Sequence, residues 1–363
     1  MHKPLVAVTL GDPTGVGPET IVGAWANPAV HEVCRPLVIG QPEIVRRAIA
    51  LLGGGQQVRE IAAPEDAEPR NDLIPCLPAG SDEALRASPA LVDARGGQAA
   101  YDALRFAAEL AIAGRIDAIV TAPLHKAALH AAGHHYPGHT ELLAKFCGVP
   151  DSQVAMMLYL AQGGPVRGAS GLGVSHVTLH NALRDVFALL TEERIVASAH
   201  LADAVLRAFR PAGSEAPRLG IAALNPHAGE QGLFGDEEQR LIAPAIERGR
   251  SEGLNLTGPL PCDTLMVRAA AGDFDAVVAM YHDQGHIALK LLGMHRAVNI
   301  TLGLPIIRTS VAHGTAFDLA WKGVADSSSM VEAIRVAALL VSQRERLVWR
   351  GQAGPEFTVN SSQ

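Results

Sequence analysis

Short apolar runs recur along the chain, separated by segments whose apolar positions repeat with helical spacing. The runs that predict strands are residues 4–10, 35–39, 118–121, 219–224 and 276–280. They are apolar at nearly every position, which is typical of strands that are covered on both faces of a parallel sheet. Helices are expected between them, for example over 97–113 and 236–252. This alternation predicts a layered α/β fold.

Three other stretches predict loops. Residues 63–72 are polar and contain proline, and residues 162–173 are rich in glycine, as expected of a hairpin tip or a mobile loop. The tail after Arg350 is polar and is expected to fray. No linker divides the chain, so two domains, if present, would share a continuous interface.

Composition narrows the classes of function. The chain has 363 residues, a net charge of −7 and no large basic block, which argues against nucleic acid as a main partner. The four cysteines are scattered without a CxxC pair, which indicates neither a disulfide framework nor a thiolate zinc site. Neither a signal peptide nor a membrane span is expected, and we therefore expect a cytoplasmic protein.

Three of the 15 histidines, His180, His227 and His282, lie near the carboxyl ends of predicted strands, where α/β proteins place their sites. Three imidazoles on one divalent metal would leave positions open for a substrate. A single histidine at a strand end is more often a structural hydrogen-bonding residue, and spacing alone does not show that these three converge. His176 is a rival ligand to His180.

Two glycine-containing turns are candidate anion sites. Residues 11–19, GDPTGVGPE, are neither a GxGxxG nor a Walker A motif, and their two prolines lack N–H groups, so a tight strand-to-helix turn is the better interpretation. Further along, Gly138, His139 and Thr140 precede an apolar helical stretch. We expect Thr140 to be the N-cap, and the free N–H groups of that helix could bind an anion or could simply be capped.

Polar residues follow His282 in apolar surroundings: Lys290, Asn299 and Arg308. A guanidinium among apolar residues needs a partner, which could be an anionic ligand or a structural ion pair. Asp263 also looks buried and could be either catalytic or a capping residue.

Nine segments together resemble one family. In order, from residue 11 to about residue 330, they are GDPTGVGPE, TAPLHK, GHTELL, LNPHAGE, GLFGDEE, GPLPCDTL, AMYHDQG, VNITLGLPIIRTS and HGTAFDLA. They resemble the 4-hydroxythreonine-4-phosphate dehydrogenase family of vitamin B6 (pyridoxine) synthesis. The resemblance implies two α/β/α domains with a cleft between them, like isocitrate and isopropylmalate dehydrogenases, and a homodimer with a shared active site. The first domain would comprise 1–137 and 300–363, and the second, 138–299, would carry the metal ligands and dimer contacts.

The resemblance also implies roles for individual residues. The metal, zinc, magnesium or cobalt, would be held by His180, His227 and His282; His180 is preferred over His176 because it stands four residues before the Arg184-Asp185 pair. The substrate-binding positions would be His139, Thr140, Lys290, Asn299 and Arg308. Lys290 and Asp263 would be catalytic. NAD or NADP would contact His313, Gly314, Thr315 and Asp326, in a segment that resembles the NAD loop of isopropylmalate dehydrogenases.

The implied reaction is oxidation of 4-hydroxythreonine 4-phosphate, or a close phosphorylated hydroxy acid, followed by decarboxylation of the β-keto acid. The segments HVTLH and DQGHIALKLLG look more like a paralogous branch that acts on D-threonate or D-erythronate 4-phosphate. Another relative oxidises an aromatic cis-dihydrodiol dicarboxylate. Ala312 and Trp321 stand where the family usually has Asp and Gly, and 162–173 looks longer than in the family.

Two other classes of function compete with this interpretation. A metal-dependent hydrolase or lyase would use the histidines without a nucleotide. A non-catalytic protein that binds a phosphorylated metabolite would need the anion site but not the metal ligands.

Overall fold

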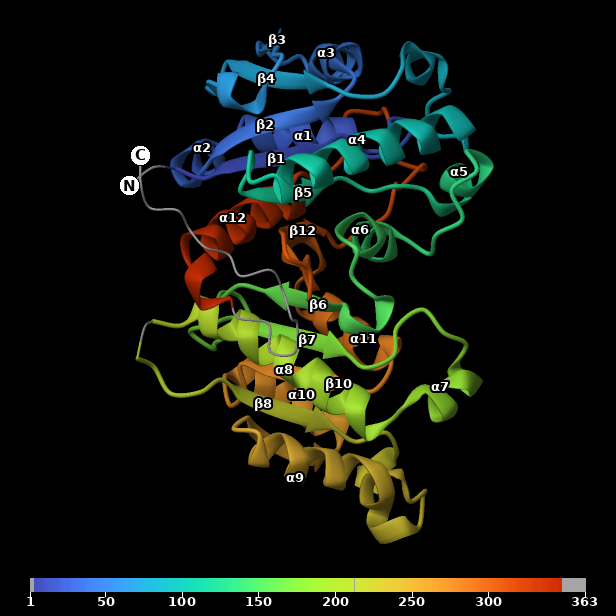
Figure 1. The fold of residues 1–363 in the computed structure, drawn as a ribbon, viewed down its shortest axis with the longest axis vertical. Helices are drawn as coiled ribbons and strands as arrows, with labels where there is room; N and C mark the ends of the chain where they lie inside the picture. Colours follow the sequence, from blue (N-terminus) through green and yellow to red (C-terminus); the bar gives the residue numbers. More distant parts are fainter. Residues whose placement is uncertain (1–2, 212, 348–363) are drawn as a thin grey trace.

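One sheet runs through the whole length of the molecule, with helices on both faces (Figure 1). The structure, a computed structural model, describes residues 3–211 and 213–347. Within these residues the strand order is β3-β4-β2-β1-β5-β12-β11-β6-β7-β10-β8-β9. No helix in the described part of the chain is both long and apolar enough to cross a membrane. The architecture is a mixed α/β fold with a large central sheet.

All five predicted strands are present, as β1, β2, β5, β8 and β10. The full set of strands is β1 (Leu5–Thr9), β2 (Arg35–Gly40), β3 (Gln57–Glu60), β4 (Leu73–Pro78), β5 (Ala118–Thr121), β6 (Ala155–Leu160), β7 (Leu172–His176), β8 (Arg218–Ala222), β9 (Asn255–Leu260), β10 (Ala276–Ala279), β11 (Val298–Leu302) and β12 (Ile307–Val311).

The five predicted strands pair in parallel with their neighbours, as expected, but strands that the sequence did not predict make the middle of the sheet antiparallel. There β11 runs antiparallel to both β12 and β6, and β6 runs antiparallel to β7. An apolar run shows that a strand is buried on both faces, but it does not show the direction of its neighbours. The glycine-rich stretch connects β6 to β7 and is therefore the expected hairpin connection, although its last two residues already belong to β7.

The helices also follow the predicted spacing. They are α1 (Gly17–Trp25), α2 (Pro28–Val33), α3 (Pro42–Leu51), α4 (Ala94–Ile112), α5 (Lys126–Ala131), α6 (His139–Cys147), α7 (Leu183–Leu189), α8 (Glu192–Phe209), α9 (Ala243–Ser251), α10 (Cys262–Ala271), α11 (His282–Gly293) and α12 (Ser328–Ser342). The helix expected over 236–252 is a π-helical turn, Glu238–Ile242, followed by α9. Residues 63–72 hold only a short 3-10 turn, and the tail after Arg350 lies outside the described residues.

Side chains on successive strand positions face opposite helical layers, as the two-residue repeat of a strand requires. In β1, Val6 and Val8 belong to a core cluster that also contains residues of α1, α8 and α12. This cluster extends over both ends of the sheet. Leu5 and Ala7 lie on the other face and pack against α4. On this second face the core is divided into two clusters, one under α4 and α6 and the other under α10 and α11.

Candidate functional site

Two of the three predicted metal ligands lie side by side. His180 follows β7 and His282 begins α11 just after β10, and β7 and β10 are parallel neighbours, so their carboxyl ends meet at one edge. The centres of the two imidazole rings are 5.9 Å apart. Nδ1 of His282 donates to the carboxylate of Asp283 at 2.7 Å, which leaves Nε2 for another partner.

The surroundings of His180 favour its neutral form. The packing around the His180 ring lowers its pKa to about 4, and the charges of Lys126 and His282 add to this effect. Neutral imidazole is the form that binds a metal ion. His180 therefore offers a nitrogen ligand at neutral pH, beside the ring of His282.

His227 does not join them within the described part of the chain. It follows β8, also a parallel neighbour of β10, but the chain then enters a left-handed turn with positive φ at every residue from His227 to Gln231. Glu238 braces the start of this turn by accepting N–H groups of Leu224 and Asn225. His227 is exposed and its ring contacts Phe234. Because the described residues hold no group of three His, Cys, Asp or Glu that could bind a metal, the three-histidine site stays a prediction.

His176 lies behind the pair and contacts a histidine that sequence reasoning missed, His286. Nε2 of His176 is 3.0 Å from Nδ1 of His286, and the ring of His286 stacks on His282 with centres 3.8 Å apart. Burial lowers the pKa of His176 well below its ordinary value and that of His286 to about 3, with further lowering by neighbouring histidines. The only signal in the sequence was that His282 and His286 share one face of a helix.

The predicted anion turn is the start of α6, with one correction. Gly138 is the N-cap and His139 and Thr140 are the first two helical residues, so the prediction that Thr140 caps the helix is wrong. Glycine is also an acceptable N-cap, and its extended backbone allows the helix to begin earlier. Burial lowers the pKa of His139 well below its ordinary value, and the charges of Arg308 and Lys126 lower it further.

Arg308 is buried in β12 close to this turn, with 3% of its surface exposed. Its Nη1 donates to the hydroxyl of Thr301 at 2.9 Å and its Nη2 to that of Thr121 at 2.6 Å, whereas Nε has no partner among the described residues. Burial lowers the pKa of the guanidinium to about 9, opposed by the charge of Glu141. Arg308 therefore contacts hydroxyl groups rather than forming the structural ion pair that was the alternative.

Lys126 connects these two regions, and the sequence analysis did not select it. It follows β5 at the start of α5, and its charge lowers the pKa of both His139 and His180. Its Cε lies 3.9 Å from the point where a side chain on Gly138 would begin. A lysine just beyond the end of a buried strand was the available signal.

The remaining predicted substrate residues are more dispersed. Lys290 is half-buried in the last turn of α11. Its charge contributes to lowering the pKa of His286 and of His313. Asn299 donates from Nδ2 to the carbonyl of Val311, and its buried Oδ1 has no partner in the described part of the chain.

Asp263 differs from its prediction. It is exposed rather than buried, and it lies in the first turn of α10, where its carboxylate accepts the N–H of Thr264. Asp263 looked buried because the residues around it in the sequence are mostly apolar. In the structure its carboxylate lies in the first turn of α10, where a negative charge is favourable and can remain exposed to solvent.

The predicted nucleotide loop packs against the first glycine turn. Thr315 is buried and its carbonyl accepts the N–H of Val16, while Glu19 accepts N–H groups of Trp321 and Gly323. Trp321 adopts φ +58°, a left-handed conformation that favours glycine, and its indole N–H donates to the carbonyl of Pro13. The other predicted loop residues lie at the surface of the chain or half-buried: His313, Gly314 and Asp326.

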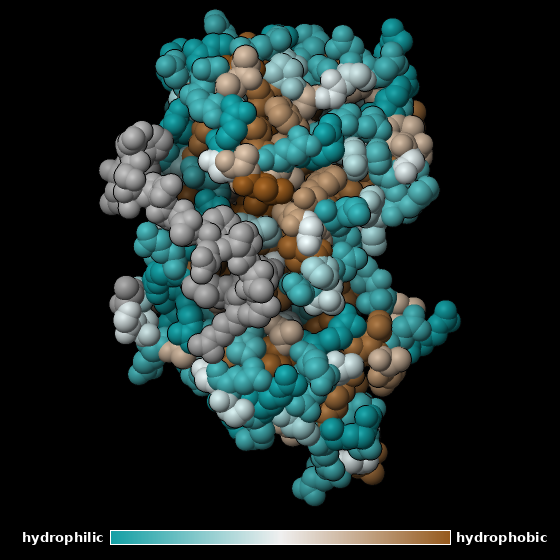
Figure 2. All heavy atoms as spheres, viewed as in Figure 1, coloured by the Kyte–Doolittle hydropathy of each residue, from teal (hydrophilic) through white to brown (hydrophobic). Residues whose placement is uncertain are grey.

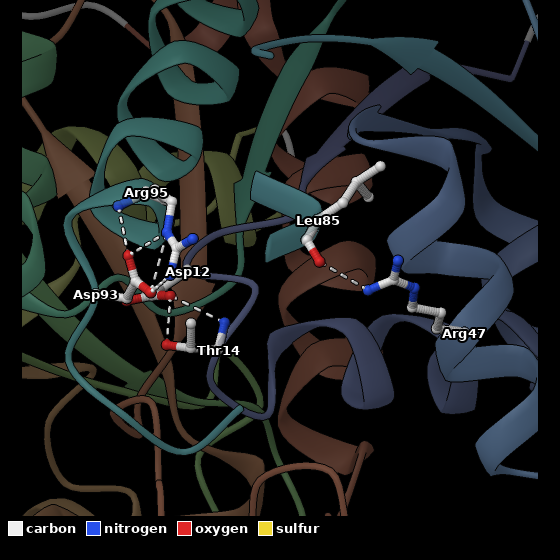
Figure 3. Close-up of polar contacts among 6 residues, drawn as sticks. All are labelled: Asp12, Thr14, Arg47, Leu85, Asp93 and Arg95. Carbon is white, nitrogen blue, oxygen red and sulfur yellow. Dashed lines mark hydrogen bonds and ion pairs between the residues drawn. The ribbon is translucent and has the colours of Figure 1, made fainter. Parts of the chain in front are cut away.

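The turn over residues 11–19 is tight, as predicted. Gly11 has φ +68°, and the carboxylate of Asp12 accepts both the N–H and the hydroxyl of Thr14 (Figure 3). The ion pair of Asp93 and Arg95 lies beside it. Burial raises the pKa of Asp12, partly offset by its bonds from Thr14. A turn with a carboxylate at its centre is not a phosphate cradle.

Known proteins are similar to this chain over most of its length. Residues 32–337 match the family described as pyridoxal phosphate biosynthetic protein PdxA. D-Threonate 4-phosphate dehydrogenase of Cupriavidus necator is 46% identical over 94% of this chain and 99% of its own length. 4-Hydroxythreonine-4-phosphate dehydrogenase of Geobacter metallireducens is 45% identical over 93% of this chain and 95% of its own.

Solved structures agree with this placement. A 4-hydroxythreonine-4-phosphate dehydrogenase from Klebsiella pneumoniae is 42% identical with a TM-score of 0.80, over 93% of this chain and 100% of that one. A terephthalate 1,2-cis-dihydrodiol dehydrogenase from Burkholderia xenovorans is less similar, at 29% identity and a TM-score of 0.59, over 93% of this chain and 98% of that one. The resemblance seen in the nine sequence segments is thus confirmed, and the chain belongs to the PdxA family.

Proposed function

We propose that this chain is an NAD- or NADP-dependent dehydrogenase that oxidises 4-hydroxythreonine 4-phosphate or a closely related phosphorylated hydroxy acid. One observation carries the proposal. Lys126, whose charge acts on both His139 and His180, lies between the cationic region around the buried Arg308 at the start of α6 and the neighbouring imidazoles of His180 and His282. A substrate with a phosphate at one end and an oxidisable hydroxyl at the other matches that charge distribution.

Different residues of this chain would contact different parts of the substrate. His139, Thr140 and Arg308 bind the phosphate, because a helix start favours an anion, and so does a guanidinium that forms no ion pair among the described residues. Lys126 screens the negative charge between the two ends of the substrate. Lys290 and Asn299 contact the carboxylate end or exchange a proton there. Asp263, exposed in one chain, serves catalysis only if a second subunit brings it to the site.

His180 and His282 fit a divalent metal in their chemistry, and the proposal assigns His227 of a second subunit as the third ligand. Such a metal, zinc, magnesium or cobalt, would supply Lewis acidity toward the substrate oxygens beside these histidines. The loop with His313, Gly314, Thr315 and Asp326 would hold the nicotinamide nucleotide, which would supply the hydride acceptor.

The experiment is a steady-state assay of reduced nicotinamide formation with phosphorylated hydroxy acids, NAD or NADP, and added Zn²⁺, Mg²⁺ or Co²⁺. The proposal expects metal-dependent reduction of the nucleotide. Substrate breakdown without reduced nucleotide would instead indicate a hydrolase or lyase, and binding without turnover would indicate a non-catalytic metabolite-binding protein.

D-Threonate 4-phosphate is the second candidate substrate. The observation that favours it is that the two segments resembling the paralogous branch contribute His176 and His286, which contact each other beside His282. The two substrates differ at C2, which carries an ammonium in one and a hydroxyl in the other. Comparing kcat/KM for both decides between them, because kcat/KM reports discrimination directly.

We also propose a homodimer whose partner covers α7, α10 and α11. Large apolar side chains are exposed on these helices, of which α7 follows His180 and α11 begins at His282, and apolar atoms reach the surface near α7 in Figure 2. The members of this exposed apolar surface are Leu183, Phe187, Val267, Ile287 and Leu291, with Met294 in the 3-10 turn that follows α11. A second copy of the chain fits it, since a closed two-fold interface would bury the apolar area and bring one more histidine to each pair.

The proposed domains are residues 1–137 with 300–363, and 138–299. Support comes from the middle of the sheet, where the antiparallel strands β11 and β6 separate two sets of parallel strands. The core on one face is also divided in the middle of the sheet, although α6, which belongs to the second unit by sequence, packs in the cluster under α4. Limited proteolysis that releases the second unit intact would support this division.

A further inference from the structure

His286 covers the flat face of His282. The two residues lie one turn apart on α11, and their rings are stacked with centres 3.8 Å apart and planes inclined by 11°. Nitrogen lone pairs lie in the plane of each ring, so two parallel stacked imidazoles cannot both point at one ion. His286 is thus placed as a neighbour of a metal ligand, not as an additional ligand.

His286 is itself held from behind. Its Nδ1 is 3.0 Å from Nε2 of His176, at the end of β7, and these two residues are 6% and 4% exposed. The close approach depends on Gly285, because a Cβ there would lie 2.7 Å from Nε2 of His176 and 2.4 Å from Val174. The hydrogen bond joins α11 to β7 and leaves the ring of His286 little freedom to turn.

The edge of His282 is held separately. Its Nδ1 donates to Asp283 at 2.7 Å, so this ring is fixed on one edge by a carboxylate and on one face by an imidazole. Partners of this kind, behind a ligating histidine, orient the ring and typically change metal affinity by about 10- to 100-fold.

We infer that His176 and His286 are positioning residues that hold the ring of His282 in the orientation needed to bind a divalent metal. The inference rests on the proposed metal site and deepens it. It also gives a physical role to two histidines in the segments that resemble the paralogous branch. The hydrogen bond from His176 fixes the orientation of the His286 ring, and the stacked His286 ring in turn orients the ring of His282.

The test is Co²⁺ binding to the full-length chain, freed of metal by a chelator and followed by the visible absorption of bound Co²⁺. His286→Ala removes the stack and is expected to weaken Co²⁺ affinity by about 10- to 100-fold. His286→Phe restores a flat ring and is expected to recover part of the loss. His176→Ala removes only the hydrogen bond to His286 and should weaken Co²⁺ affinity less. His134→Ala is the matched control, a part-buried histidine that stacks on Tyr101 and should leave affinity unchanged.

Two further measurements separate the possible failures. His282→Ala tests the metal site itself: if it binds Co²⁺ like the wild type, or if the wild type binds none, the proposed metal site and this inference are both wrong. If His282→Ala loses binding while His286→Ala retains wild-type affinity, only the positioning role is overturned. Thermal unfolding of the metal-free variants identifies a merely structural role, which would lower stability and leave Co²⁺ affinity unchanged.

Discussion

Glu19, in the first helix, accepts a hydrogen bond from the backbone N–H of Trp321, and its other carboxylate oxygen accepts the N–H of Gly323 at 2.7 Å. One buried carboxylate thus fixes a loop some three hundred residues away in sequence. The glycine turn at the start of the chain is therefore not itself a nucleotide motif. It is the surface on which the proposed nucleotide loop rests.

Glu19→Ala should weaken the binding of NAD more than the binding of the phosphorylated acid. Each hydrogen bond to a charged group contributes about 1.5–3 kcal/mol, and both N–H groups would lose their partner. We expect KM for the nucleotide to rise by about 10-fold or more, with KM for the phosphorylated acid nearly unchanged, in steady-state kinetics with each substrate varied. Glu19→Gln keeps one acceptor and should lie between. An equal rise in both KM values would contradict a role in nucleotide binding.

Arg308→Ala should weaken the binding of phosphorylated substrate. Loss of a charge-assisted contact of about 1.5–3 kcal/mol corresponds to about a 10- to 100-fold rise in KM. Arg335→Ala, which removes an exposed arginine paired with Glu332, is the matched control and should have no effect. If the wild type turned over the unphosphorylated acid equally well, there would be no phosphate site to lose.

The metal-free protein should lose stability as the pH falls. Burial lowers the pKa of His180 to about 4 and of His286 to about 3, below the ordinary value of 6.5. Between about pH 6.5 and about pH 4 the unfolded chain binds more protons than the folded one, so stability decreases as pH falls through this window. Thermal unfolding at pH 8 to 5 with a chelator should show a falling Tm, and His286→Phe should flatten the dependence. A Tm that rises on acidification would contradict these shifted pKa values.

Leu291→Glu should separate the proposed dimer. Leu291 is 83% exposed on α11, so the change costs little in an isolated chain but buries a charge in an interface. Sedimentation is expected to show monomers with greatly reduced activity. Leu339→Glu, at an exposed position on α12, is the control and should remain dimeric. A wild-type chain that sediments as a monomer and is fully active would remove the basis for a shared site.

The sequence predicted five of the twelve strands in the described residues, and their parallel pairing, but not the antiparallel strands in the middle of the sheet. Runs such as β1 and β10 are recognisable because nearly every residue is apolar, whereas β12 carries Arg308 in its middle and β3 is largely exposed. The antiparallel pairing of β6 and β11 depends on how distant segments meet, and no local pattern records it.

Strand order alone accounts for the part of the arrangement that the sequence could indicate. His180 and His282 follow adjacent parallel strands, so their meeting could be expected, and the same reasoning applied to His227. A left-handed turn made largely of non-glycine residues then carries His227 away, and such a turn has no sequence signature. Glu19, Lys126 and His286 were missed because their roles arise from contacts between segments far apart in the chain.

In the proposed dimer, one subunit supplies His180 and His282 to each site and the other supplies His227. Subunit exchange between inactive variants distinguishes this arrangement from a site within one chain. In a mixture of His227→Ala and His282→Ala, each heterodimer keeps one intact site, so activity should return to about a quarter of the wild-type value. In a mixture of His180→Ala and His282→Ala, every site lacks a ligand and activity should stay absent. Recovery in the second mixture, or no recovery in the first once exchange is demonstrated, would contradict the account.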